Sequence, residues 1–392
     1  MLDTWQNTIE RARSLRLHLH THPELAWHET RTAARIRELL TELKIPWQAC
    51  AGTGTLARLN QHSTHNKGPH IALRGDIDAL PINEQTGKAW SSCTPGHMHA
   101  CGHDGHTATL YAAAHWLKQH EDQWPGPVTL IFQPAEEGGH GALKMIQDGA
   151  LKGIDEIYGW HNWPAIAFGE IVCPDGLVMC GNSTFRLTVN GRGGHASQPE
   201  LCRDPVLAAS AITMALQQIM SRRLAPQQAA VVSVTSINAP SGDTIIPQQA
   251  IIGGSIRVPD KATGTYINGL ITSISQQTAL AYGVECEVEI FPRYNATINH
   301  AVQAQRVRHL WEEEYGLSAI NKNLLMPVMA SEDFSYYLQE IPGAFALVGA
   351  DDGPDNQAPC HSPHYDFNDR LIPLVARLFA RLAGAPVPQR RV

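Results

Sequence analysis

The densest set of chemically reactive side chains lies in the segment GHMHACGHDGH, residues 96–106. Its reactive members are His97, His99, Cys101, His103, Asp104 and His106. A thiolate and an imidazole two residues apart can reach one metal ion from an extended loop. The alternative is a solvated, histidine-rich loop with a buried thiol. The density of ligand types in this short segment favours a metal site.

A second reactive segment, QPAEEGGHG, carries two adjacent carboxylates, Glu136 and Glu137. They follow the apolar run VTLIF and enter a glycine-rich turn. In an extended backbone, successive side chains point to opposite sides. One carboxylate could therefore bind a metal ion while its neighbour faces the substrate, which is the division of labour that metal-assisted hydrolysis needs. The alternative interpretation is an ordinary solvated pair of acids.

Further ligand types are scattered along the chain. Asp76 and Asp78 occur in RGDIDALP, His161 follows the apolar run IDEIYGW, and His361 follows Cys360 in APCHSPHYDF. Each of these residues alone is more often structural. Together with the two dense segments they supply a thiolate, carboxylates and imidazoles, enough for two divalent ions and for metal-assisted hydrolysis.

Composition agrees with metal chemistry and excludes several classes of protein. The chain has 392 residues, 20 His and 8 Cys, with 43% hydrophobic residues and a net charge of −7. It has no basic patch for nucleic acid and no apolar run near the roughly 18 residues that span a bilayer. The first residues lack the continuous apolar stretch of a signal peptide, so we expect a cytoplasmic protein without nucleic-acid or membrane partners.

The elements that must position these residues alternate between strands and helices. Apolar runs such as HIALRGDIDALP and VTLIFQPAEEGG end in polar turns, with helices expected near 105–119 and 140–150. This pattern predicts an α/β domain around a largely parallel sheet. In such folds functional groups gather where strands end, and the reactive residues of these runs lie there.

The middle of the chain has a different pattern. We expect strands at 184–191, 229–239, 250–259 and 284–291, with helices at 204–224 and 261–283. The order βαββαβ is that of a ferredoxin-like unit. We therefore predict a catalytic domain in two parts, 1–183 and 297–392, interrupted by an inserted domain at 184–296. An edge strand of the insert could pair with its twin across a two-fold axis.

Several motifs together resemble one known family. They are RGDIDALP, HACGHDGHTATL, QPAEEGGHGA, GWHNWP, GRGGHASQP, GSIR and SEDFSYY, in this order. They are similar to the amidohydrolase branch of the dinuclear-metal aminoacylase and carboxypeptidase superfamily, which includes hippurate hydrolase and the auxin–amino-acid conjugate hydrolases. The resemblance runs from about His18 to the last helix. It implies a catalytic α/β domain with an inserted dimerisation or lid domain.

The resemblance also implies roles for individual residues. The metal ligands would be Cys101, His103, Glu137, His161 and His361. Cys101 would replace the bridging carboxylate of the wider superfamily. Glu136 would be the general base, and Asp78 would orient a ligand or tune the site.

Three further residues are implied in the inserted domain. His195 in GRGGHASQP would stabilise the oxyanion, often from the partner subunit, and Arg257 in GGSIR would hold a substrate carboxylate. Thr244 stands where the family usually has Asn, which changes the reach and donor number of a substrate-binding side chain.

The predicted activity is cleavage of the amide bond of N-acyl amino acids, hippurate-like or N-acetylated, to a carboxylic acid and a free amino acid. A metal-activated water would attack the amide while Glu136 accepts its proton. Two divalent ions per subunit are expected, Zn or Mn first, with Co or Ni as alternatives. We further expect an exposed Cys101 thiolate that oxidises readily without metal, and a homodimer or homotetramer.

Three other functions compete with this prediction. A dipeptidase or carboxypeptidase would use the same dinuclear site and require a free α-amino group. A non-catalytic metal-binding or regulatory protein would lack a ligand or the base, and all of them are present. A hydrolase with a Ser or Cys nucleophile would leave the adjacent glutamates unexplained.

Overall fold

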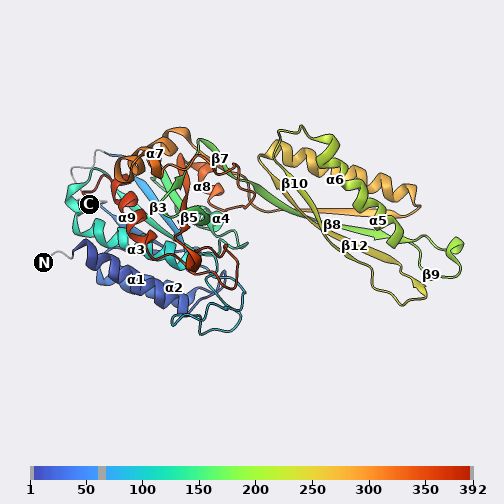
Figure 1. The fold of residues 1–392 in the computed structure, drawn as a ribbon, viewed down its shortest axis with the longest axis horizontal. Helices are drawn as coiled ribbons and strands as arrows, with labels where there is room; N and C mark the ends of the chain where they lie inside the picture. The colour runs from blue at the N-terminus through green and yellow to red at the C-terminus, as the bar shows by residue number, and fades with distance from the viewer. Residues whose placement is uncertain (1–3, 61–67, 389–392) are drawn as a thin grey trace. The chain divides into compact units, whose positions relative to one another are not determined.

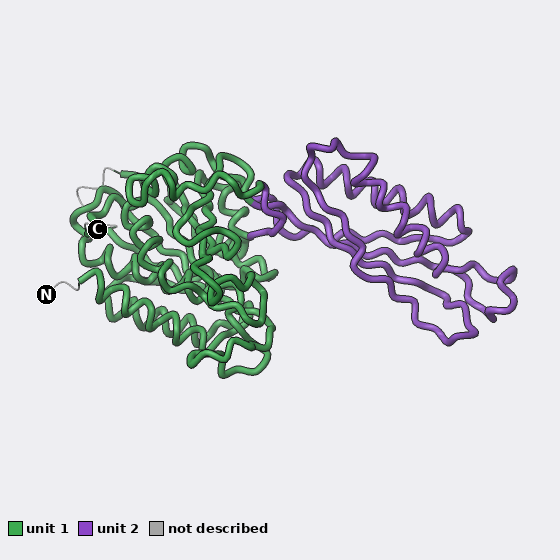
Figure 2. The backbone as a smooth tube through the Cα atoms, viewed as in Figure 1, with its two compact units in different colours: residues 1–178, 298–325, 333–392 green, residues 179–297, 326–332 purple. Residues whose placement is uncertain are grey.

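The computed structural model describes residues 4–60 and 68–388, and these divide into two compact units (Figure 2). Unit 1 comprises residues 1–178, 298–325 and 333–392, and unit 2 comprises residues 179–297 and 326–332. The sequence predicts the boundaries of the inserted domain at 183/184 and 296/297. The short segment 326–332 was expected in the catalytic domain, but it packs with unit 2, where Val328 bridges to Met179.

Unit 1 is built on a seven-stranded sheet in the order β1-β2-β4-β3-β5-β15-β6. The strands are β1 (Trp47–Cys50), β2 (Gly54–Leu59), β3 (Ile71–Asp76), β4 (Val128–Gln133), β5 (Glu156–Ala167), β6 (Ile171–Val172) and β15 (Gly343–Asp351). The four central strands run parallel, while β1, β2 and β6 are antiparallel to their neighbours. β3 and β4 are buried along their whole length, as expected for strands covered on both faces.

Helices cover both faces of this sheet (Figure 1). They are α1 (Trp5–Thr21), α2 (Thr30–Glu42), α3 (His103–Gln119), α4 (Gly141–Gln147), α7 (Ala301–Tyr315), α8 (Ser335–Glu340) and α9 (Leu371–Leu382). On one face, Leu73 and Phe132 join a core cluster with residues of α1, α3 and α9. On the other face, a Cβ at Gly159 would lie 2.6 Å from Phe334 at the start of α8. With both faces of the sheet covered, a functional site is expected at the ends of its strands.

Unit 2 has a four-stranded antiparallel sheet in the order β10-β12-β8-β13, covered by two helices. Its elements are β8 (Gly181–Asn190), α5 (Pro205–Leu216), β10 (Val231–Asn238), β12 (Gln249–Val258), α6 (Lys261–Ala281) and β13 (Glu285–Pro292). Asp204 begins α5 by accepting a hydrogen bond from the Val206 N–H, and Asp260 begins α6 through the Thr263 N–H. This order is that of the ferredoxin-like arrangement, and the predicted fold class is confirmed.

Smaller elements were not expected from the sequence. β9 (Gly194–His195) and β11 (Ile245–Ile246) form a two-stranded ribbon, and β7 (Gly176–Met179) pairs with β14 (Thr297–Asn299). The expected helix 204–224 is divided, because α5 ends at Leu216 and a π-helical turn follows at Ile219–Arg223. Strands of two to four residues carry too little alternation to be recognised from sequence. No helix among the described residues is long and apolar enough to cross a membrane.

Candidate metal-dependent active site

The residues predicted to bind metal come together where the parallel strands of unit 1 end. β3 ends at Asp76 and β4 at Gln133, and these two residues are paired in register. β5 lies on the other side of β3, with Tyr158 opposite Leu73, so His161 reaches the level of Asp76 three residues later. The register therefore brings the segments that carry Asp78, Glu136 and His161 to one edge, where α/β folds place their functional groups.

Cys101 and His103 reach this edge from the loop before α3 and from its first residue. Gly102 lies between them with φ of +92°. A Cβ at this position would be 2.3 Å from Asn162 Oδ1 and 2.5 Å from the Tyr365 hydroxyl, so only glycine fits. Cys101 and His103 can therefore both reach this edge because the chain turns sharply between them.

His103 is oriented by Asp78. Its Nδ1 lies 2.9 Å from the Asp78 carbonyl oxygen and 3.3 Å from Asp78 Oδ1. Its Nε2 is fully buried, makes no hydrogen bond and lies 3.6 Å from Asp76 Oδ2. A buried imidazole nitrogen without a hydrogen bond normally costs about 1–3 kcal/mol, unless a ligand completes it. A metal ion is the ligand that fits this donor set.

The remaining candidates surround the same point. Cys101 Sγ lies 3.3 Å from His161 Nε2, whose other ring nitrogen faces the Asn162 carbonyl oxygen at 2.7 Å. His361 Nε2 lies 3.2 Å from Glu137 Oε1. His361 itself has φ of +68°, and its N–H donates to the Ala100 carbonyl oxygen, which ties the last ligand segment to the loop of Cys101.

Three overlapping groups of ligand atoms, each within 4.8 Å of one another, contain all five predicted ligands and the base. They are Cys101–His103–His161, Cys101–Glu137–His361 and His103–Glu136–Glu137. Cys101, His103 and Glu137 each belong to two of the three groups, so the groups form one continuous cluster. A fourth group joins Asp76 with His103 and His106, where Asp76 also pairs with Arg74 at 2.6 Å.

The electrostatics of the cluster favour a cation. Burial opposes protonation of His103, but Asp76, Asp78 and Glu137 outweigh it and raise the pKa of His103 to about 10. For Glu137, burial raises the pKa, but the hydrogen bond from His361 and the charge of His103 keep it below its usual value. Asp76, whose pKa is lowered despite its burial by Arg74 and His103, and Glu137 are therefore ionised at neutral pH, and their negative charge favours a bound cation.

The expectation of an exposed Cys101 is wrong. Cys101 is 8% exposed. Its contact with Cys360, its burial and the charge of Glu137 raise the pKa of its thiol. Without a cation the group is therefore a buried thiol rather than an exposed thiolate, and a bound cation would stabilise the thiolate.

The two neighbouring carboxylates are directed differently. Glu136 is 6% exposed and its Oε1 accepts a hydrogen bond from the Asp333 N–H at 3.3 Å. Glu137 is fixed through its backbone, because its N–H donates to Asp78 Oδ2 at 2.9 Å. Ala135, just before them, has φ of +53°, a conformation that costs a non-glycine residue of order 1–3 kcal/mol.

The three residues predicted in the inserted domain all lie in unit 2. His195 is an exposed residue of the β9/β11 ribbon, and Thr244 is an exposed residue directly before β11, where the Ala196 N–H donates to the Thr244 carbonyl oxygen. His195 Nδ1 accepts a hydrogen bond from the Ser197 N–H at 3.1 Å. The neutral ring then carries its proton on Nε2, which leaves this atom free to donate outward.

Arg257 lies on the four-stranded sheet of unit 2, at the end opposite the ribbon. It pairs with Asn182 on β8, whereas Gln249 pairs with Asn190 at the end from which the ribbon continues. Eight residues of strand span about 26 Å. One small substrate therefore cannot contact both His195 and Arg257 of the same subunit.

Sequence analysis missed two buried acids, Glu24 and Glu29, in the segment HPELAWHET. Glu24 caps α2 by accepting from the Thr32 N–H at 2.8 Å, and Glu29 reaches the loop of Glu136. Two acids near a helix start read as ordinary capping residues, so only the tertiary contacts distinguish them.

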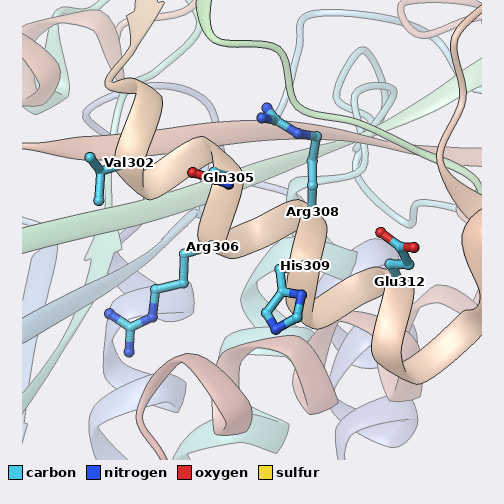
Figure 3. A pocket seen from close by; sticks show the side chains of 6 residues that line it. All are labelled: Val302, Gln305, Arg306, Arg308, His309 and Glu312. Carbon is cyan, nitrogen blue, oxygen red and sulfur yellow. The ribbon is translucent and has the colours of Figure 1, made fainter.

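A surface hollow elsewhere in unit 1 is lined by none of the predicted metal ligands and not by the predicted base. Figure 3 shows its lining, which comes from α7 alone: Val302, Gln305, Arg306, Arg308, His309 and Glu312. Arg306 is paired with Glu156, the first residue of β5, and Arg308 with Asp175. The hollow therefore lies where β5 begins, at the end opposite His161.

The comparisons with known proteins agree with this geometry. Residues 72–385 match the family described as Peptidase family M20/M25/M40. The N-acetyl-L-cysteine deacetylase of Bacillus subtilis is 38% identical over 359 residues, covering 91% of this chain and 84% of that protein. The hippurate hydrolase of Campylobacter jejuni is 35% identical over 372 residues, covering 94% of each chain.

A solved structure from Bacillus subtilis, described as a dinuclear metal binding peptidase from the M20 family, has a TM-score of 0.81 to this chain. It is 29% identical and covers 97% of this chain and 100% of that one.

Proposed function

This chain belongs to peptidase family M20/M25/M40, and from that premise we propose that it hydrolyses the amide bond of N-acyl amino acids. The observation that carries the proposal is the junction of β3, β4 and β5, where the predicted ligands gather and the buried carboxylate of Glu136 lies beside His103 and Glu137. The resemblance expected from the sequence is confirmed, and a metal-dependent amide hydrolase is the activity that the family and the relatives support.

We propose two divalent ions per subunit, held by Cys101, His103, Glu137, His161 and His361. When bound, the ions would polarise the amide carbonyl and acidify a water molecule. The mixed thiolate, imidazole and carboxylate donors suit Zn or Mn, and they also accept Co or Ni. By accepting a hydrogen bond from Nδ1–H, Asp78 would keep His103 in the tautomer whose Nε2 lone pair is available to a metal ion.

Glu136 would act as the base. Its carboxylate is buried and held by the Asp333 N–H, so it can accept the proton of the attacking water and pass it to the leaving amine. His195 would donate from Nε2 to the developing oxyanion, and Arg257 would form a bidentate pair with the substrate carboxylate.

The separation of His195 and Arg257 supports a shared active site in a homodimer. Because one substrate cannot reach both residues of one subunit, we propose that His195 comes from the partner subunit while Arg257 acts in its own. The inserted unit would be the dimerisation domain. Its edge strand β10 has no second strand partner among the described residues, so it could pair with β10 of the partner subunit. A cytoplasmic location remains part of this proposal.

A panel of substrates tests the activity. Enzyme reconstituted separately with Zn and Mn should release amine from N-acetyl and N-benzoyl amino acids, and a chelator should abolish the release. Turnover of unblocked dipeptides alone would replace the proposal with the dipeptidase alternative. Silence toward both classes would refute it.

Mixed dimers test the shared site. Co-expressed Glu136→Gln and His195→Ala subunits, carrying different tags, can be purified as the hybrid. If His195 acts in the partner's site, the hybrid has one complete site and about half of the wild-type activity, while each parent homodimer is inactive. An inactive hybrid would place His195 in its own subunit.

A further inference from the structure

Glu29 is a fully buried carboxylate that the proposed mechanism leaves without a role. It occupies the position that caps α2, yet its side chain makes no capping hydrogen bond. The capping is done instead by Glu24, whose oxygens accept from the Thr32 N–H at 2.8 Å and the Arg31 N–H at 3.2 Å. A buried carboxylate that does not cap its own helix needs hydrogen bonds from another segment, because an unpaired buried carboxylate is strongly disfavoured.

The segment that Glu29 contacts is the loop of the base. Glu29 Oε1 accepts a hydrogen bond from the Ala135 N–H at 2.8 Å, and its Oε2 accepts one from the Thr53 hydroxyl at 2.7 Å. Thr53 lies beside Gly54, where a Cβ would be 2.8 Å from the Pro134 ring. The carboxylate is therefore clamped between the turn after β1 and the loop after β4.

Ala135 is the residue on which the direction of the loop depends. Its positive φ is sterically disfavoured for alanine, so neighbouring contacts must hold it there. Its N–H is bound by Glu29 and its carbonyl oxygen accepts from the Gly141 N–H at 3.0 Å. The loop is tight as well, because a Cβ at Gly139 would meet the Ala135 Cβ at 2.6 Å.

Two buried carboxylates thus hold the backbone on both sides of the base. Glu29 binds the N–H of Ala135, directly before Glu136, and Asp78 binds the N–H of Glu137, directly after it. Between these anchors the chain turns, so that Glu136 faces the Asp333 N–H while the carboxylate of Glu137 faces His361.

We propose that Glu29 is a positioning residue that holds the Ala135 N–H and thereby separates the directions of Glu136 and Glu137. It acts through the loop and touches neither substrate nor metal. The inference rests on the proposed function for its catalytic readout, and on the ligand role of Glu137 for its metal readout.

The site keeps an acid here at an electrostatic cost. Burial and the nearby charge of Asp78 raise the pKa of Glu29. A glutamine could accept from the Ala135 N–H with its amide oxygen and donate to the Thr53 hydroxyl with its amide nitrogen. Since the proposed role is geometric, glutamine should replace glutamate, whereas alanine should not.

The test compares Glu29→Ala, Glu29→Gln and the matched control Glu24→Ala in the full chain. Zinc affinity of the chelator-stripped protein is measured by competition with a chromogenic chelator, and kcat and KM are measured on the reconstituted enzyme. We expect Glu29→Ala to weaken zinc binding and lower kcat about 10- to 100-fold, with KM changed less than about threefold. Glu29→Gln should remain within about threefold of wild type in both.

Glu24→Ala removes a buried acid from the same helix end but not from the loop. It should lower the melting temperature by a few degrees, as Glu29→Ala does, while zinc affinity and kcat stay near wild type. Equal losses in the two alanine variants would overturn the proposal, and so would a folded Glu29→Ala with wild-type zinc affinity and kcat. If wild-type enzyme cleaves no amide, the proposed function fails, but the zinc measurement still tests Glu29.

Discussion

The candidate metal-ligand cluster of unit 1 (Cys101, His103, Glu137, His161 and His361, with Glu136) and the β9/β11 ribbon of unit 2, which carries His195, are built in opposite ways. In the cluster, His103 is 0% exposed and is held by a carboxylate that also fixes Glu137. On the ribbon, His195 is exposed, its strand has two residues, and its ring is hydrogen-bonded to Ser197 two positions away. The hydrogen bonds of the cluster are thus formed before any substrate arrives. The proposed donor on the ribbon, His195, is exposed, and its position does not depend on a bound ion.

This difference assigns different consequences to mutation. Changes in the cluster should alter metal retention, turnover and stability together, because the same buried hydrogen bonds serve all three. Changes on the ribbon should alter turnover or substrate preference and leave metal content and stability untouched.

The largest effect is expected from Glu136→Gln, the one change in the cluster that should spare the metal. The amide cannot accept the proton of the attacking water, so kcat should fall about 10³-fold or more. Metal content, measured by elemental analysis, should stay at the wild-type value. Glu137→Gln is the adjacent control and should lose metal. Retained turnover in Glu136→Gln would remove this residue from the role of base.

His195→Ala should reduce kcat about 10²- to 10³-fold without changing metal content or melting temperature, because it removes one oxyanion donor from an exposed ribbon. Ser197→Ala is the matched control. The Ser197 backbone N–H still donates to Nδ1, so kcat should change less than about threefold. Loss of metal in His195→Ala would contradict the separation of the two regions.

A buried clamp beside the cluster should make the stability of unit 1 depend on pH. His20 Nδ1 lies 2.8 Å from Asp104 Oδ2, and its Nε2 lies 3.3 Å from Glu84 Oε1. Burial opposes the charged ring, but Asp104 and Glu84 raise the pKa of His20 to about 9. Burial also opposes the charge of Glu84, but the hydrogen bonds from His20 and the Ser92 N–H lower its pKa to about 2.

The signs of the two shifts define a window. The contribution of His20 is complete below its ordinary pKa of 6.5 and is lost as pH rises through about 9. The contribution of Glu84 is complete above its ordinary pKa of 4.5 and is lost as pH falls toward about 2. The clamp is therefore strongest from pH 4.5 to 6.5.

Denaturant unfolding of His20→Gln tests this clamp. The free energy of unfolding should fall by on the order of 2–3 kcal/mol at pH 6, and the deficit should shrink toward pH 9.5. His18→Gln, an exposed position on the same helix, should change stability by less than about 0.5 kcal/mol. A deficit for His20→Gln that is constant between pH 6 and 9.5 would argue against the charged clamp.

The smallest effect is expected on the ribbon at Thr244. Thr244→Asn restores the amide that the family usually has, adding a donor and a longer reach. We expect the ratio of kcat/KM for N-acetyl and N-benzoyl amino acids to shift by about three- to tenfold, with metal content unchanged. An unchanged ratio across the panel would exclude Thr244 from substrate selection.

The sequence by itself determined the fold class and the residues with the right chemistry. Long elements have a clear period, so the strands of HIALRGDIDALP and VTLIFQPAEEGG and the helix 261–283 of the insert were predicted close to their observed positions, whereas the predicted helix 204–224 ends earlier, at Leu216. The reactive segments were recognisable because thiol, imidazole and adjacent carboxylates are rarely so dense without a ligand. The ligand assignments within them came from resemblance and stay predictions.

Only the tertiary structure decided which groups are coupled. Asp78 and Glu29 lie 59 and 106 positions from the backbone N–H groups that they bind, and nothing in their local sequence distinguishes them from ordinary acids. The burial of Cys101 and the distance between His195 and Arg257 likewise depend on strand register and helix packing. Periodicity and residue type are local properties, whereas burial, hydrogen-bond partners and pKa depend on segments that meet only in the folded chain.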